Sequence, residues 1–236
     1  MVRTARAAVG GICYHVLNRG NDRKAIFRQA GDFDEFLSVV AIAVTRYPLE
    51  VFAYCLMPNH FHLVVRPSDN DTLARWIHWL LTVHAQAHRR RYDTAGHIWQ
   101  GRFKAFPIED DNHLLTVVRY VERNALRANL VARAEDWRWG SLRERLGRER
   151  RGLLGDLPFE LPRDWRAQVN AVESDSTLSA VRKCVDTGRP FGSDAWVRRS
   201  EATLGARFVV RSRGRPRKSE HSGDCGVLPG MNPPAD

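Results

Sequence analysis

Two β-type runs joined by a very short connection constrain the fold of this chain more than any other feature. Residues 49–56 and 61–66 are rich in strand-forming side chains, and only Met57-Pro-Asn-His60 lies between them. A connection of this length joins antiparallel neighbours, so the two runs should form a β-hairpin. The fold should therefore contain an antiparallel sheet built around this hairpin.

The second run of the hairpin begins with His60-Phe61-His62. Side chains on a strand alternate between its faces, so both imidazoles should point the same way while Phe61 enters the opposite, buried layer. Two imidazoles on one face can clamp a metal ion. The alternative is a pair of structural histidines at the start of a strand. Imidazole suits zinc or manganese better than magnesium, and an additional oxygen ligand would favour Mg²⁺ or Mn²⁺.

The segments around the hairpin complete an α+β pattern. Residues 10–18 alternate like a strand, 32–47 and 72–92 have helical apolar spacing, 99–108 lead into a fourth strand, and 110–126 form a further helix. The order βαββαβα matches the ferredoxin-like plan, an antiparallel sheet with helices packed on one face.

Tyr120 and Asn124 lie four residues apart on the last of these helices and should share a face. A phenol has a pKa near 10, so its attack on a phosphodiester needs a nearby cation. The amide oxygen of Asn124 could supply a third metal ligand. The simpler interpretation of Tyr120 is a half-buried helix aromatic. Glu109, Asp110 and Asp111 fit helix N-terminal charges better than they fit metal ligands.

The charge of the chain points to a nucleic-acid partner. It has 37 basic and 27 acidic residues, a net charge of +10, and only four of the basic residues are lysines. Arginine binds phosphate and guanine edges well, although genome base composition can produce the same bias. Arg119, Arg123 and Arg127 recur every four residues, either as a rail for DNA phosphates or as a solvated stripe.

The periodicity weakens after Trp139, which suggests that the chain has several parts. We expect a main domain over 1–145, a Gly- and Pro-containing linker over 146–162, a basic extension over 163–218 and a disordered tail over 219–236. The extension should contain a small helix within 191–208. Residues 207–218 carry six cations and no acid.

Other features are compatible with a cytosolic protein. The four cysteines are widely spaced and should be reduced thiols, and no apolar run is long enough to span a bilayer. His78, His84 and His88 should be partly exposed helix histidines, although the last two have the spacing of a metal-binding pair.

With Leu56-Met-Pro-Asn-His-Phe-His-Leu63, Trp99-Gln-Gly-Arg-Phe103 and Arg119-Tyr-Val-Glu-Arg-Asn124 in view, the chain resembles the single-tyrosine HUH transposases, and among them the REP-associated tyrosine transposases. The resemblance covers about residues 8–142. It implies a ferredoxin-like nuclease that cuts single-stranded DNA near hairpins, leaving a 5′-phosphotyrosine and a free 3′-hydroxyl. Tyr120 matches the nucleophile, His60 and His62 the metal pair, and Asn124 the polar ligand for Mg²⁺ or Mn²⁺.

The family usually has Asn-Pro-Val-Arg-Ala where this chain has Asn124-Ala-Leu-Arg-Ala128. Without the proline, the helix that carries Tyr120 should continue. The residues expected to contact DNA are Arg19, Arg23, Arg102, Lys104, Arg119, Arg123, Arg127, Arg213, Arg215, Arg217 and Lys218. The Gly214-Arg-Pro-Arg-Lys218 segment resembles the minor-groove core of an AT-hook, or is simply a basic tail.

The resemblance favours a monomer over a homodimer and a nucleoid-associated cytoplasmic location, and it leaves open whether the protein is mobile or domesticated. Two other classes of function remain. A ferredoxin-like sheet with a basic surface could be a catalytically idle module that binds DNA or RNA. A zinc-stabilised structural protein would need a fourth ligand that the sequence does not provide.

Overall fold

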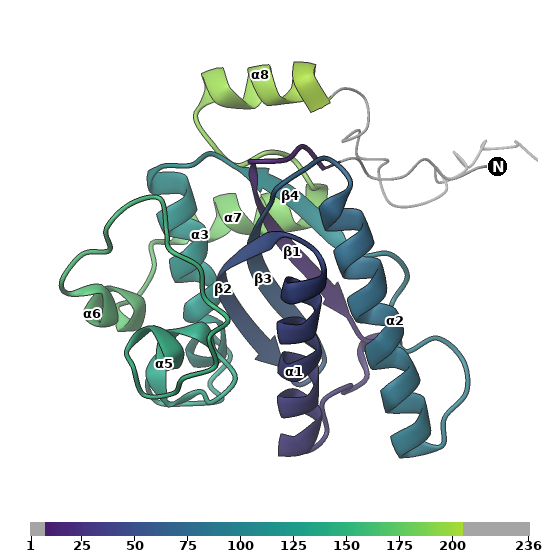
Figure 1. The fold of residues 1–236 in the computed structure, drawn as a ribbon. Coiled ribbons are helices and arrows are strands. Elements are labelled where there is room, and N and C mark those ends of the chain that lie inside the picture. The colour runs from purple at the N-terminus through teal and green to yellow at the C-terminus, as the bar shows by residue number, and fades with distance from the viewer. Residues whose placement is uncertain (1–7, 205–236) are drawn as a thin grey trace, which may run out of the picture.

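The computed structural model describes residues 8–204 of the chain, and Figure 1 shows its architecture. The elements of the main domain run in the order β1 Cys13–Arg19, α1 Ala30–Arg46, β2 Leu49–Met57, β3 His60–Pro67, α2 Thr72–Tyr92, β4 Lys104–Ile108 and α3 Asn112–Glu122. They are followed by α4 Asn124–Arg127, α5 Ser141–Arg145, α6 Trp165–Asn170, α7 Asp175–Thr187 and α8 Asp194–Leu204. Short 3₁₀ turns occur at Asn21–Arg23 and Ala134–Asp136.

The strands form one antiparallel sheet in the order β2-β3-β1-β4. β2 and β3 are the predicted hairpin, paired from Leu49 with Pro67 to Met57 with His60. β1 lies between β3 and β4, with Leu17 opposite His62 and Arg19 opposite His60. The predicted α+β fold and the predicted order of its elements are confirmed.

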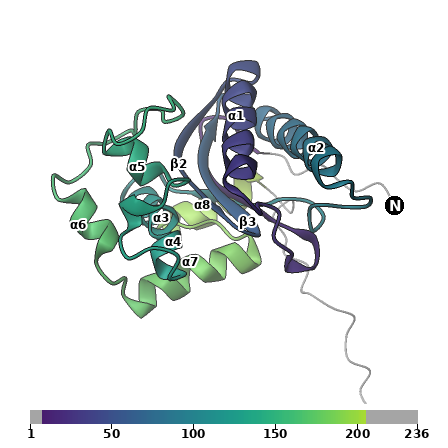
Figure 2. The same ribbon diagram turned by 90° about the horizontal axis from the view of Figure 1, so that it is seen from below.

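The prediction that the helices cover one face of the sheet is wrong. Helices α1 and α2 pack over the face that carries Phe61 and Leu63, whereas α3 covers the face that carries Val64 and Phe106 (Figure 2). The second face also needs cover because most of its strand residues are apolar. Removing those side chains from water requires a layer of its own.

The helix predicted over residues 110–126 is interrupted. Helix α3 ends at Glu122 and α4 begins at Asn124, with Arg123 between them. The expectation that the helix continues in the absence of the family's proline is therefore wrong. The reason is tertiary: the Arg123 guanidinium donates to the carbonyl oxygens of Val169 and Asn170, and Ala125 is fully buried beside the sheet.

The segment after residue 145 packs on the main domain. Trp165 and Val169 on α6 and Val181 on α7 are buried in the same cluster as the apolar face of α3. Residues 146–162 do not form a free linker throughout, because Leu153 is buried and the Gly155 amide donates to Val51 O at 2.9 Å. The domain boundaries stay a prediction. The helix expected within 191–208 is observed as α8, while Arg213, Arg215, Arg217, Lys218 and the tail over 219–236 lie outside the described residues.

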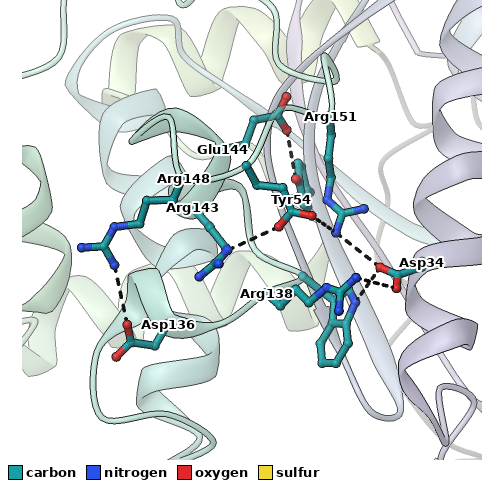
Figure 3. Close-up of polar contacts among 10 residues, drawn as sticks. Asp34, Tyr54, Asp136, Arg138, Arg143, Glu144, Arg148 and Arg151 are labelled. Carbon is teal, nitrogen blue, oxygen red and sulfur yellow. Dashed lines mark hydrogen bonds and ion pairs between the residues drawn. The ribbon is translucent and has the colours of Figure 1, made fainter.

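A polar network holds this later segment against the β2 edge (Figure 3). Asp34 on α1 receives hydrogen bonds from Arg138 at 3.0 Å and Arg151 at 3.3 Å. The Tyr54 hydroxyl on β2 donates to Glu144 at 2.9 Å. Several of the arginines that follow the tyrosine helix therefore hold the fold together, since their charges are balanced by acids within the chain.

The prediction of partly exposed histidines on the second helix is wrong for two of the three. His84 is 2 % exposed and His88 is 5 % exposed, whereas His78 is exposed. His84 and His88 extend the apolar stripe of α2 at four-residue spacing, so they enter the layer between α1 and α2. Cys13, Cys55 and Cys184 are free thiols in the buried core. None of the helices in the described part of the chain has the length and hydropathy of a membrane span.

Candidate active site

The strand register brings three imidazoles to the face of the sheet that α3 covers. His60 and His62 lie on β3 with ring centroids 5.0 Å apart, and Phe61 between them is buried under α1 on the opposite face. His15 on β1 joins them, and its Nε2 atom lies 2.8 Å from Nδ1 of His62. As expected, His60 and His62 therefore share one face of the sheet and Phe61 lies on the other.

The Nδ1 atoms of both β3 histidines have hydrogen-bond partners. Asn59 Oδ1 lies 2.6 Å from Nδ1 of His60, and the Asn59 amide nitrogen donates to the Arg23 carbonyl oxygen, which fixes the orientation of the amide. Because Oδ1 can only accept, the His60 proton is on Nδ1 and its Nε2 retains a lone pair. The Nδ1 atom of His62 is engaged by His15.

All three imidazoles are neutral at neutral pH. Burial lowers the pKa of His15 to about 3, and the positive charge of Arg127 adds to this effect. Burial, together with the charges of Arg19 and Arg127, lowers the pKa of His60 to about 4. The pKa of His62 lies well below its ordinary value, chiefly because of burial. A neutral imidazole is the form that binds metals, so no proton has to be displaced.

Tyr120 faces this histidine cluster from α3. Its ring centroid lies 6.0 Å from that of His62 and 6.0 Å from that of His15, in both cases edge to face. The residue is 6 % exposed. The fold thus brings the predicted nucleophile and the predicted metal pair together within one chain, across about sixty residues of sequence.

Asn124 lies just beyond the break between α3 and α4. It is 7 % exposed, and its Nδ2 atom has no hydrogen-bond partner among residues 8–204. A buried amide that serves only the fold usually has its donors satisfied. Asn124 follows Tyr120 by four residues across the break at Arg123, and its role as a metal ligand stays a prediction.

The three arginines of the predicted phosphate rail bind the chain itself in this conformation. Arg119 donates to the carbonyl oxygens of Gln168 and Ala171, and Arg123 to those of Val169 and Asn170. These contacts attach α6 to the tyrosine helix. A role for Arg119 and Arg123 in DNA binding stays a prediction that would require these donors to be released.

Arg127 occupies a different position from the other two. Its guanidinium lies over the Tyr120 ring, with Cζ 4.0 Å from the centroid, and it pairs with the buried Glu173 at 2.7 Å. A guanidinium stacked on a ring in this way is a cation–π contact. Arg127 therefore connects the tyrosine, the histidines whose pKa it lowers, and the segment after α6.

The remaining predicted DNA contacts are spread over one end of the sheet and its loops. Arg19 ends β1 opposite His60, and Arg23 is exposed in the turn that follows. Arg102 is exposed in the loop before β4. Lys104 is half-buried on β4 and donates to the Val185 carbonyl oxygen on α7 at 3.3 Å. Arg19 and Arg23 lie at the end of β1 next to His60.

A second group of potential metal ligands lies at the start of α3. One ligand atom each from Glu109, Asp111 and His113 lies within 4.8 Å of the others. Asp111 caps the helix by accepting from the His113 amide, and Glu109 accepts from the Ser193 amide. The capping contact of Asp111 agrees with its expected place at the helix N-terminus, whereas Glu109 contacts Ser193 before α8.

Sequence reasoning did not single out His15, Asn59, Glu122 or Glu173. A signal for His15 existed in β1, where Tyr14 and Val16 occupy one face and leave His15 on the other, the face of His62. Glu122 is buried and accepts from Ser141, Arg145 and the Trp165 indole. No local pattern marks Glu122 or Glu173, because their partners lie far along the sequence.

Comparison with known proteins assigns this geometry to a family. The family model described as "Transposase IS200 like" matches residues 8–124. This segment contains the histidine pair, Tyr120 and Asn124. The chain belongs to the IS200-like transposases.

A curated relative of this transposase supports the assignment, and a solved structure shares the fold. A Haemophilus influenzae protein named as a REP-associated tyrosine transposase is 29 % identical over 144 residues, which cover 56 % of this chain and 75 % of that protein. A solved structure of a REP-associated tyrosine transposase bound to a REP hairpin shares the fold, with a TM-score of 0.52 and 16 % identity. That match covers 69 % of this chain and 93 % of the other.

Proposed function

We propose that this transposase cuts and rejoins single-stranded DNA beside hairpins through a covalent link between Tyr120 and a 5′-phosphate. The observation that carries the proposal is the position of Tyr120, whose ring centroid lies 6.0 Å from that of His62 in the same chain. A phenol and a metal-binding imidazole at this separation can act on one phosphodiester. Membership of a transposase family supports this chemistry, because transposases cut and join DNA strands.

His60 and His62 fit a divalent cation, because both are neutral and each has its Nδ1 atom engaged by a partner. The buried Asn124 amide is the candidate third ligand through its Oδ1 atom, and its Nδ2 atom has no hydrogen-bond partner among the described residues. An oxygen ligand beside two imidazoles favours Mn²⁺ or Mg²⁺ over zinc. When bound, the cation would draw charge from the phosphate oxygens.

The residues of the chain then supply the nucleophile and its surroundings. The Tyr120 oxygen would form a bond to phosphorus while the bond from phosphorus to the 3′ oxygen breaks. The phenol loses one proton and the departing 3′ oxygen gains one. Because one phosphodiester bond replaces another, the step needs no ATP. The Arg127 guanidinium, 4.0 Å from the Tyr120 centroid, would stabilise the negative charge that develops on the phenol and the phosphate.

Hairpin DNA is the proposed substrate because a relative with the same fold was solved with a REP hairpin. Arg19 and Arg23 lie at the end of β1 beside His60, where they could hold the phosphates next to the cleavage point. Arg102 and Lys104 are further candidate contacts, because Lys104 pairs with Leu17 near the same end of β1 and Arg102 precedes it in the loop. Such a substrate would place the protein at chromosomal DNA in the cytoplasm.

We also propose that the protein acts as a monomer, because both edges of the sheet pair with other segments of the same chain. At the β2 edge, the Leu56 amide donates to Trp139 O at 3.0 Å and the Gly155 amide to Val51 O at 2.9 Å. At the β4 edge, the Phe191 amide donates to Pro107 O at 2.9 Å. These contacts occupy backbone groups that a second copy would need in order to extend the sheet at either edge.

The test is a covalent-adduct assay. Labelled single-stranded hairpin oligonucleotides from the host's repeats are incubated with the wild type, Tyr120→Phe or Tyr47→Phe, in Mn²⁺ or in EDTA, and resolved on a denaturing gel. We expect an adduct with the wild type and Tyr47→Phe in Mn²⁺ only, and none with Tyr120→Phe. Hairpin binding without any adduct would favour the catalytically idle binding module instead. Tightly held zinc in the purified protein would favour the structural-zinc alternative.

A further inference from the structure

His15 is a fully buried imidazole that the proposed chemistry does not use directly. It lies on β1 two residues before Leu17, the residue paired with His62. Diagonal neighbours on adjacent strands project from the same face of a sheet. Its Nε2 atom lies 2.8 Å from Nδ1 of His62, which is a hydrogen bond between two neutral rings.

The surroundings of His15 hold its ring in one place. Its ring plane lies within 16° of that of His62, and the 4.9 Å between their centroids fits two rings joined edge to edge by the N···N hydrogen bond. It meets the Phe106 ring edge to face at 4.9 Å. Tyr120 closes a third side at 6.0 Å. The rotation of the His62 ring is therefore restricted, with Nδ1 directed at His15 and Nε2 at the opposite edge of the ring.

The two β3 histidines are supported in the same way by different parts of the chain. Asn59, the residue before His60, accepts from its Nδ1 atom. His15 holds Nδ1 of His62 from the neighbouring strand. A metal-binding imidazole commonly donates its second N–H to an acceptor that fixes both its tautomer and its orientation.

We propose that His15 is a positioning residue for His62: it accepts the Nδ1 proton of His62 and so leaves the lone pair on Nε2 for the metal. This inference rests on the metal site of the proposed function. The proton of His15 itself must then be on Nδ1, an atom that has no partner among the described residues. An apolar ring would fill the same space without burying an unpaired polar atom, so packing alone does not explain a histidine here.

The experiment measures Mn²⁺ affinity of the full chain without DNA, from the electron paramagnetic resonance signal of free Mn²⁺. His15→Phe retains a ring but no acceptor, and His15→Gln can place its side-chain oxygen near the position of Nε2. We expect Mn²⁺ affinity to fall roughly 10- to 100-fold in His15→Phe. His15→Gln should stay within about fivefold of the wild type, since its oxygen can accept the same proton.

Phe106→Leu is the matched packing control, because it alters a ring that contacts His15 but leaves the hydrogen bond intact. It should bind Mn²⁺ as the wild type does, and thermal unfolding of every variant reports whether it is folded. If His15→Phe binds as tightly as the wild type, or if His15→Gln and Phe106→Leu lose as much affinity as His15→Phe, the role assigned to His15 is wrong.

A second measurement observes the proton directly. Long-range ¹H–¹⁵N spectra of the Mg²⁺-saturated protein distinguish protonation at Nδ1 from protonation at Nε2. We expect His62 to carry its proton on Nδ1, and a His62 protonated on Nε2 would overturn the proposal. His62→Ala separates the two levels of inference. If the wild type binds Mn²⁺ no better than His62→Ala, both the metal site and the role of His15 are wrong. If the wild type binds Mn²⁺ more tightly than His62→Ala and His15→Phe binds as tightly as the wild type, the metal site stands and only the role of His15 is wrong.

Discussion

Arg127 stacks on Tyr120, with its guanidinium carbon 4.0 Å from the centre of the ring. The same guanidinium donates to the Tyr120 carbonyl oxygen at 3.2 Å and pairs with Glu173 at 2.7 Å. Its charge also lowers the pKa of His15, His60 and His62. One side chain therefore contacts the nucleophile and influences the proposed metal ligands.

Replacing Arg127 should slow formation of the DNA adduct more than it weakens DNA binding. A donor aimed at developing charge contributes about 10²- to 10³-fold in rate. We expect Arg127→Met to lower the single-turnover adduct rate by roughly 10²-fold, and Arg127→Lys to retain part of it because the charge remains without the planar stack. The rate is measured with excess protein over labelled hairpin. Equal rates for all three proteins would exclude Arg127 from the chemistry.

Glu122 should be a principal stabilising residue of the tyrosine helix. Its buried carboxylate accepts from Ser141 and Arg145 on α5 and from the Trp165 indole on α6, so it joins two later segments to the tyrosine helix. Glu122→Gln retains the volume but leaves the largely buried Arg145 charge without its partner. We expect a loss of about 3 kcal/mol in the free energy of unfolding, measured by urea denaturation.

The matched control for Glu122 is Glu50→Gln. Glu50 is exposed, and its pair with Arg66 at 2.7 Å lies at the surface. Surface pairs contribute about 0–1 kcal/mol, so this variant should unfold close to the wild type. Similar losses in the two variants would show that the Glu122 contacts are no more important than a surface ion pair.

The protein should lose stability as the pH falls below about 6.5, the ordinary pKa of an unfolded histidine. Burial lowers the pKa of His84 to about 3, with a further contribution from His88, and that of His15 to about 3. Below pH 6.5 the unfolded chain binds protons at these positions while the folded chain does not. Each such histidine removes about 1.4 kcal/mol per pH unit until the folded pKa is reached.

His84→Phe tests this dependence at a site away from the proposed metal ligands. His84 lies among Phe27, Phe36 and Trp99, so a phenyl ring suits the position. Between pH 6 and pH 4, the variant's unfolding free energy should fall less steeply than that of the wild type, by about 1.4 kcal/mol per pH unit. The exposed His78→Gln serves as the control. An unchanged slope in His84→Phe would mean that His84 accepts a proton in the folded state.

Arg23 should contribute one electrostatic contact to hairpin DNA. Each phosphate neutralised by a basic side chain contributes about one unit to the slope of log affinity against log salt concentration. Arg23→Ala should weaken binding at low salt and reduce the magnitude of this slope by about one. The control is Arg189→Ala, which removes an exposed charge two residues before Phe191. Phe191 pairs with Ile108 on β4, beside Cys13 at the other end of β1, so this variant should leave the slope unchanged. Equal slopes in both variants would place Arg23 outside the interface.

The sequence by itself determined the parts of this protein whose pattern is local. The alternating runs, the four-residue turn and the helical apolar stripes were sufficient to predict the order of strands and helices. His60 and His62 share a face because they are two residues apart on a strand, a geometry that holds before any tertiary contact forms. The motifs at residues 56–63, 99–103 and 119–124 likewise indicated the family without a structure.

Only the tertiary structure decided how these parts meet. Contacts between residues distant in sequence placed α3 on the second face of the sheet, interrupted it at Arg123 and brought Tyr120 to the histidines. Arg119, Arg123 and Arg127 each have a partner more than forty residues away, in the segment 168–173. Their spacing therefore indicated a basic stripe but not the segment that this stripe holds. Periodicity shows which face a side chain occupies, whereas the packing of the whole chain decides what covers that face. For the same reason His15 joins His62 only through the pairing of β1 with β3.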